Sequence, residues 1–287
     1  MFMNSHDVAT SAVLALLFEV SANPKSGNVD RDHNFEDLKY EDFLASSVAS
    51  YRIFLRAAEK IGSIGDLVLD AIIESSRWHK AKNVHFGAFL LLIPLAYSSE
   101  AKDAEEMSQL AVDNLKQTSY NDSISVFKAF KICNARVMRA DKLSLEDDYT
   151  IYWIKKEKIN LYEWMLMAPK ENLNARELIE GYKISLDGMK EFTNKINEFK
   201  DINVATVLTY HYLLSKYPDT LVIAKHGREI AEKVMAKSKQ ILDEFNGDLG
   251  VFKSFDEELI SKGINPGAIA DITCTSIFLA LIEGVKF

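Results

Sequence analysis

Cysteine, proline and glycine are all scarce in this chain of 287 residues, and each shortage excludes a class of structure. The two cysteines, Cys133 and Cys274, cannot build a disulfide framework and show no CxxC or other metal-ligand spacing. They are expected to be buried small hydrophobes in a reducing, cytoplasmic compartment. Five prolines and twelve glycines leave few points at which a helix must end, which favours long helices.

The chain also lacks a positive net charge and long apolar runs. The net charge of −8 and the pI near 5.4 argue against a general electrostatic grip on nucleic acid, because phosphate neutralisation needs a basic surface. The longest apolar run, residues 86–97, contains Pro94 and suits a buried helix better than a membrane span. The first twenty residues lack a basic n-region, so we expect a helix there rather than a signal peptide. The sequence therefore predicts neither nucleic acid nor a membrane as partner, and it leaves a homo-oligomer open.

Apolar residues recur at helical spacing almost throughout, as in Ile230, Val234 and Ile241, whereas strand alternation is nearly absent. The pattern predicts an all-α fold. No long linker or fixed-period repeat appears, so residues 1–287 are expected to form a single multi-helix domain. The predicted helices cover residues 6–21, 38–61, 66–75, 85–98, 101–117, 121–138, 146–157, 160–168, 173–198, 202–215, 219–245, 252–262 and 267–284.

The loop Asn23–Arg31 carries the densest group of polar residues in the sequence. Pro24 holds Asn23 extended and Gly27 allows unusual backbone angles, so a tight turn leaves the preceding helix. Glu19 lies in the last turn of that helix, where a carboxylate opposes the helix dipole. The residues indicate either a ligand site or a polar loop with solvated charges.

Three further segments share this combination of a helix terminus with polar residues. Asn83 and His85 precede the apolar helix near residue 88, where they could hold a ligand or simply cap the helix. Residues 218–228 bring Asp219, Lys225 and His226 together, as a phosphate patch or as an N-cap followed by a solvated face. In residues 263–271, Pro266 suits the first turn of the last helix and Asp271 then enters an apolar helix, either paired or functional.

Helical folds build sites from facing helix ends, so we expect these four segments to converge on one pocket. No P-loop, dinucleotide fingerprint, HExxH pair, GxSxG elbow or EF-hand is present in the sequence, which leaves the better-known mechanisms without support.

Five blocks, in this order and spacing, resemble the triphosphoribosyl-dephospho-CoA synthase family in the form found in archaea. They are EVSANPKSGNVDR, NVHFGAFLLLIPLA, LYEWMLMA followed by NARELIEGY, YPDTLVIAKHGREIA, and GINPGAIADIT. The resemblance runs from about residue 10 to the C-terminus. It implies an all-helical transferase that removes adenine from ATP and joins the triphosphoribosyl group to a hydroxyl of dephospho-CoA or a related acceptor.

The resemblance also implies roles for individual residues. Cleavage of an N-glycosidic bond needs carboxylates near the sugar, hydrogen bonds to the departing base and cations on the phosphates. The predicted catalytic carboxylates are Glu19, Asp30 and Asp271. Magnesium is expected with ATP, and its predicted ligands are Glu19, Asp30 and Asp219. The predicted substrate-binding residues are Lys25, Arg31, Asn83, His85, Asp219, Lys225, His226 and Asn265.

Two departures from the family pattern keep other functions open. His85 stands where such proteins tend to carry an asparagine, and the expected Pro-Gly-Gly turn is missing near Cys133–Arg136, where the helical pattern continues. The alternatives are a catalytically impaired nucleotide-binding or scaffold protein, and a hydrolase that cleaves the N-glycosidic bond without an acceptor. On either nucleotide-binding hypothesis Lys25 faces the phosphates, so a Lys25→Ala variant is expected to lose ATP affinity while keeping its melting temperature.

Overall fold

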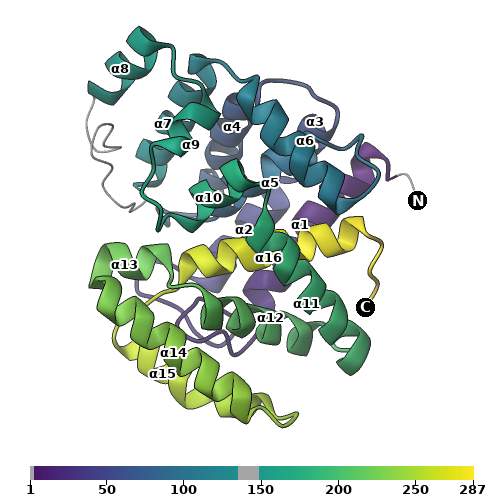
Figure 1. Ribbon diagram of the computed structural model, residues 1–287, viewed down its shortest axis with the longest axis vertical. Helices are drawn as coiled ribbons and strands as arrows, with labels where there is room; N and C mark the ends of the chain where they lie inside the picture. The colour runs from purple at the N-terminus through teal and green to yellow at the C-terminus, as the bar shows by residue number, and fades with distance from the viewer. Residues whose placement is uncertain (1–2, 135–148) are drawn as a thin grey trace.

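Helices make up the regular secondary structure of this protein. The computed structural model describes residues 3–134 and 149–287 (Figure 1). Within those ranges there is no β-sheet, only one isolated bridge between Phe35 and Leu38, so the predicted all-α class is confirmed. The α-helices are α1 (Ser5–Ser21), α2 (Tyr40–Ala49), α3 (Tyr51–Ala58), α4 (Ile64–Ser76), α5 (Phe86–Ala96), α6 (Ala104–Lys116), α7 (Tyr120–Cys133), α8 (Tyr149–Glu157), α9 (Leu161–Leu166), α10 (Leu173–Glu180), α11 (Lys183–Phe199), α12 (Ile202–Lys216), α13 (Thr220–His226), α14 (Arg228–Glu244), α15 (Lys253–Ser261) and α16 (Gly267–Ile282), with a 3₁₀ turn η1 (Leu249–Phe252) before α15.

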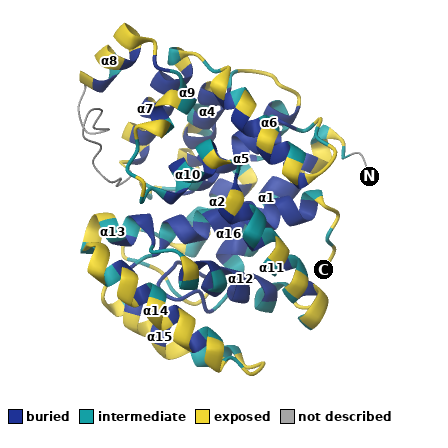
Figure 2. Cartoon of the chain, viewed as in Figure 1, coloured by how far each residue is buried: buried dark blue, intermediate teal, exposed yellow. Residues whose placement is uncertain are grey.

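The last long helix, α16, crosses the middle of the molecule (Figure 1). It packs against α1, α5, α11 and α12; α5 and α16 are largely buried, whereas α11 has a long exposed face (Figure 2). The hydroxyls of Thr273 and Ser276 in α16 are satisfied within the helix, because they donate to the carbonyls of Ile269 and Ile272, one turn earlier. One cluster of buried apolar residues extends from Val8 in α1 to Leu281 in α16, so the described helices share a core, as a single multi-helix domain requires.

Three predicted helices are in fact divided, two of them at residues with positive φ. The predicted helix over residues 219–245 breaks at Gly227, whose φ of 87° lies outside the helical region. The predicted helix over residues 173–198 breaks at Gly181 and Tyr182, which both have positive φ. The new helix α11 then starts under the Glu177 carboxylate, which accepts the N–H groups of Ile184 and Ser185. The predicted helix over residues 38–61 divides at Ser50, between α2 and α3.

The helix predicted over residues 121–138 ends at Cys133. Asn134 caps it in the left-handed conformation, with φ of 47°. Asparagine tolerates that conformation because its short polar side chain relieves the steric cost. The expectation of a continuous helix through Cys133–Arg136 is therefore wrong at Asn134, and Ala135 and Arg136 lie outside the described residues, as does the start of the helix predicted over residues 146–157.

The described helices also bear on the membrane question. None of them is both long enough and apolar enough to cross a bilayer, and the apolar helix α5 has only 11 residues.

Candidate active site

A cleft opens where the starts of four helices meet. We call it the central cleft and define it by two adjoining hollows that share Asn83, Phe86, Gly87, Leu221 and Asp271. The N-terminal residues of α5, α10, α13 and α16 all contribute to its walls. Its other polar lining residues are Glu19, Asn28, His85, Asn172, Asn174, Thr220 and Asn265. Helix starts carry partial positive charge and unpaired N–H groups, so the geometry suits an anionic ligand.

Asp271 is the carboxyl group at the centre of this cleft. Its Oδ2 accepts a hydrogen bond of 3.0 Å from the Asn174 amide, and the N–H of Ala88 donates to it as well. The side chain keeps some contact with the cleft, while protein surrounds it on its other sides. Burial raises the pKa of Asp271 to about 8, with the negative charges of Glu19 and Asp219 acting in the same direction. The carboxyl group is therefore mainly protonated at neutral pH and can donate a proton into the cleft.

The start of α5 lacks the usual side-chain cap. His85 precedes it in the left-handed conformation, with φ of 59°, and its side chain makes no capping bond. Within the described residues, no group accepts a hydrogen bond from the N–H of Phe86 or Gly87. Since both residues line the cleft, these two donors are available to a ligand.

His85 and Asn174 each present one unused atom to a ligand. The Nδ1 of His85 lies 2.9 Å from the Ser46 hydroxyl, whereas its Nε2 is buried and has no hydrogen-bond partner in residues 3–134 and 149–287. Burial lowers the pKa of His85 to about 3, so the ring is neutral and interacts by hydrogen bonding rather than by charge. The Oδ1 of Asn174 is likewise buried and unpartnered. Unpaired buried polar atoms are costly, which favours a bound ligand as their partner.

Lys25 is fully buried and is not free to meet a phosphate. Its ammonium group donates to the Glu19 carboxylate and, at 3.2 Å, to the Oδ1 of Asn28. The Asn28 amide in turn donates to Asn265 across the cleft wall. Burial raises the pKa of Glu19, while the Lys25 charge opposes that shift. Lys25 therefore does not reach the cleft as a phosphate ligand, and because its charge is paired inside the protein we now expect its loss to lower the melting temperature.

The other predicted cations lie outside the lining of the central cleft. Lys225 and His226 both donate to the carbonyl of Gly263, at 2.9 and 3.1 Å, and so brace the loop that leads into Asn265. Arg31 donates to Asn203. The predicted phosphate patch therefore does not line the cleft. Lys225 and His226 hold a neighbouring loop, and the walls of the cleft are formed by helix starts instead.

Asp219 serves as a structural brace. Its Oδ1 accepts the N–H groups of Leu221 and Val222 at the start of α13, and its Oδ2 accepts the N–H of Ile269 in α16. With both oxygens engaged, it holds two of the helix starts together.

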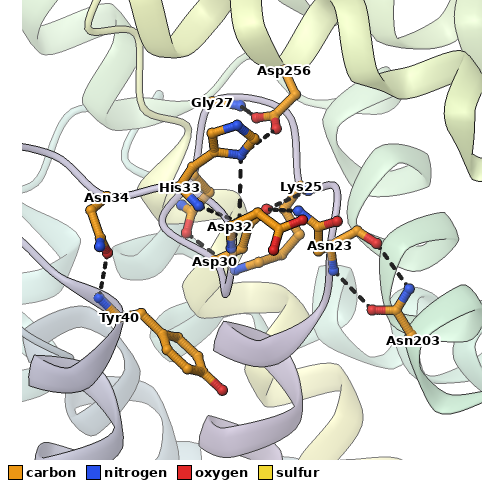
Figure 3. Close-up of polar contacts among 11 residues, drawn as sticks. Asn23, Lys25, Gly27, Asp30, Asp32, His33, Asn34, Tyr40, Asn203 and Asp256 are labelled. Carbon is orange, nitrogen blue, oxygen red and sulfur yellow. Dashed lines mark hydrogen bonds and ion pairs between the residues drawn. The ribbon is translucent and has the colours of Figure 1, made fainter.

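Asp30 lies in the same loop as Lys25 but not in the lining of the cleft. Its carboxylate accepts four hydrogen bonds, two of them from the backbone N–H groups of Asp32 and His33 (Figure 3). Glu19, Asp30 and Asp219 do not form one metal-binding group among the described residues. Asp30 lies instead beside His33 and Asp256, two residues that the sequence did not single out.

Sequence reasoning also missed Gly87 and Asn174. Only the absence of a side chain at Gly87 allows α5 to approach Asp271: a Cβ there would lie 1.9 Å from the Asp271 Oδ2 and 2.6 Å from the Asn174 amide nitrogen. Asn174 follows the helix cap Asn172 and gave no separate signal, since its partner Asp271 lies 97 residues away.

A Gly87→Ala variant should therefore lose the cleft geometry while keeping the fold. We expect destabilisation of about 1–3 kcal/mol from overpacking, and a loss of ligand binding that exceeds it because Asp271 is displaced. Calorimetric titration with ATP and a melting curve on the same preparation measure both effects. A Gly181→Ala variant is also strained, because φ at Gly181 is 82°, but its Cβ meets no atom within 4 Å and Gly181 does not line the cleft. This control should lose stability without losing ATP affinity. ATP affinity unchanged in Gly87→Ala would contradict this geometry.

Comparisons with known proteins point to the same family over nearly the whole chain. A family model described as ATP:dephospho-CoA triphosphoribosyl transferase matches residues 5–286. A relative from Streptococcus equi subsp. equi (strain 4047), named 2-(5''-triphosphoribosyl)-3'-dephosphocoenzyme-A synthase, is 25% identical over 96% of this chain and 97% of its own. A relative of the same name from Streptococcus pyogenes serotype M5 (strain Manfredo) is 22% identical, with 96% of each chain covered.

A solved structure gives the same result. A protein from Archaeoglobus fulgidus named for triphosphoribosyl-dephospho-CoA synthase is 44% identical in sequence, and its structure matches with a TM-score of 0.72. The match covers 85% of this chain and 100% of that one. The resemblance of the five sequence blocks is thus confirmed by both sequence and structure.

Proposed function

The chain belongs to the ATP:dephospho-CoA triphosphoribosyl transferase family, an enzyme family, and we propose that it transfers the triphosphoribosyl group of ATP to dephospho-CoA or a related acceptor with release of adenine. The observation that carries the proposal is a cleft walled by helix starts that contains the Asp271 carboxyl group, whose pKa burial raises to about 8. Such a cleft offers a proton donor for a departing base beside hydrogen-bond donors for phosphates.

In this proposal Asp271 is the general acid. As the C1′–N9 bond of ATP breaks, the bonding electron pair leaves with adenine, and Asp271 gives its proton to the base. The acceptor hydroxyl forms the new bond to C1′, and its proton returns to the Asp271 carboxylate, so the carboxyl group is restored. Glu19, the other carboxylate in the cleft, stabilises the positive charge that develops on the ribose.

Binding of ATP then depends more on amide groups than on charged side chains. The free N–H groups of Phe86 and Gly87 at the start of α5 donate hydrogen bonds to phosphate oxygens. Asn83, His85, Asn174 and Asn265 supply hydrogen bonds to the ribose and adenine. The predicted magnesium ligands do not fit a preformed site, because Glu19, Asp30 and Asp219 do not come together as one metal-binding group among the described residues. Magnesium would therefore enter as part of the MgATP substrate.

The pH dependence of the reaction follows from the acid role. Asp271 must be protonated, and burial raises its pKa to about 8. We expect kcat/KM for ATP to be level below that pH and to fall about tenfold per unit above it. His85 stays neutral throughout, since its pKa is lowered to about 3. Adenine release measured from about pH 6 to about pH 10 checks this. A rate that rises with pH across that range would show that the carboxylate form is the active one.

A three-arm assay tests the function itself. The protein is incubated with MgATP and dephospho-CoA, with MgATP alone, and with dephospho-CoA alone, and free adenine is measured by chromatography. The proposal expects adenine mainly in the first arm. Equal release in the first two arms would indicate a hydrolase, and no adenine in any arm would favour a nucleotide-binding or scaffold role.

A further inference from the structure

Asp30, His33 and Asp256 form a compact cluster outside the lining of the central cleft. One ligand atom from each lies within 4.8 Å of the others (Figure 3). Both carboxylates are fully buried, whereas the His33 side chain is 25% exposed and gives the cluster an opening to solvent. Asp30 and His33 come from the loop after α1, and Asp256 comes from α15, so the cluster joins segments more than 220 residues apart.

Two atoms of the cluster have no hydrogen-bond partner among the described residues. They are the Oδ2 of Asp256 and the Nδ1 of His33, which lie 2.9 Å apart, within ion-pair distance (Figure 3). The other oxygen of Asp256 is occupied by the N–H of Gly27, at 2.8 Å. A fully buried carboxylate thus directs into the cluster an oxygen that makes no hydrogen bond within the described residues, which favours a bound cation as its partner.

The spacing of these atoms matches the edges of a metal coordination sphere. Ligands bound at about 2.1 Å and separated by 90–110° lie about 3.0–3.4 Å apart. The Nδ1 of His33 lies 2.9 Å from the Asp256 oxygen and 3.5 Å from the Asp30 oxygen. The four hydrogen bonds to Asp30 fix its carboxylate in this position, as is usual for metal ligands.

The local charge also favours a cation. Asp30 and Asp256 are buried together, and the nearby Lys25 is already paired with Glu19. Two buried carboxylates at close range repel each other unless a proton or a positive charge offsets their charge. A divalent ion supplies both charges and leaves His33 as a neutral ligand.

We propose that Asp30, His33 and Asp256 bind a divalent cation of the Mn²⁺ or Zn²⁺ class, which fastens the loop after α1 to α15. The imidazole ligand favours such ions over Mg²⁺, which prefers oxygen ligands only. Three protein ligands leave coordination positions open toward the exposed side of His33. Because Lys25 and Asn28 of the same loop support Glu19 and the cleft, the cation stiffens the loop on which the cleft depends.

Metal titration without nucleotide tests the site. Protein freed of metal with a chelator is titrated with Mn²⁺, followed by electron paramagnetic resonance, and with Zn²⁺ and Mg²⁺ in calorimetry. We expect one Mn²⁺ or Zn²⁺ per chain, Mg²⁺ at least tenfold weaker, and at least tenfold weaker Mn²⁺ binding in His33→Gln and Asp256→Asn. The control Glu257→Gln changes the exposed neighbour of Asp256 on the same helix and should bind like wild type.

Melting curves separate this site from an ordinary ion pair. Added Mn²⁺ should raise the melting temperature of the wild type and of Glu257→Gln but not of the two ligand variants. The absence of Mn²⁺ and Zn²⁺ binding at millimolar concentration, or equal binding by Asp256→Asn, would overturn the inference. Because no nucleotide is present, neither result depends on whether the chain is a transferase.

Discussion

Replacing Asp271 by asparagine is expected to lower kcat for adenine release by about 10²–10⁴ while leaving the fold intact. Asparagine has nearly the same shape and can still bond to Asn174, but it has no proton to give to the departing base. Stability should not fall, because the substitution removes a carboxyl group whose ionisation burial opposes. Single-turnover measurement of adenine release, with a melting curve, gives both quantities.

The control for this variant is Asp243→Asn, which makes the same chemical change on the exposed face of α14. It should match the wild type in rate. The pH profile adds a second criterion, because the residual activity of Asp271→Asn should no longer fall above about pH 8. A rate for Asp271→Asn within threefold of the wild type would show that another group protonates adenine.

Replacing Lys25 by alanine is expected to destabilise the protein by about 3–5 kcal/mol. The variant leaves the Glu19 carboxylate buried without its counter-charge, and Asn28 loses a donor that helps to hold the cleft wall. For a chain of this size the melting temperature should fall by about 10 °C. Differential scanning calorimetry measures the change.

A double variant separates the ion pair from simple packing. If the cost arises from the unpaired charge, Glu19→Gln combined with Lys25→Met should be less destabilised than Lys25→Ala alone, because neither partner is then charged. Exposed Lys239 in α14 offers the control, and Lys239→Ala should melt like the wild type. A melting temperature of Lys25→Ala within 2 °C of the wild type would contradict the buried pair.

The fold could be predicted from the sequence because helical periodicity is a local property. The order of the helices and the buried character of residues 86–97 follow from spacing alone. The breaks at Gly227 and Tyr182 could not be predicted with the same ease, since apolar spacing continues across them. At Tyr182 the positive φ is imposed by tertiary structure, where the Glu177 carboxylate caps α11 and the Tyr182 hydroxyl donates to Leu91 in the core.

The candidate site was only partly predictable. Glu19, Asn83, Asn265 and Asp271 were marked by polar groups at helix ends, and the structure places all four in the lining of the cleft. Charge was a poorer guide, because sequence does not reveal whether a lysine faces solvent or neutralises a buried carboxylate. Contacts between distant segments carry no local signal either, and Asp256 shows this, since its partners Gly27 and His33 lie more than 220 residues away.

Transfer of labelled ribose tests the central claim most directly. ATP labelled in the ribose is incubated with the protein, magnesium and dephospho-CoA, and the products are analysed by mass spectrometry. The proposed function predicts that the label, still attached to three phosphates, appears covalently bound to dephospho-CoA in an amount equal to the adenine released. Adenine released without labelled dephospho-CoA, or label that remains wholly in ATP, would contradict it.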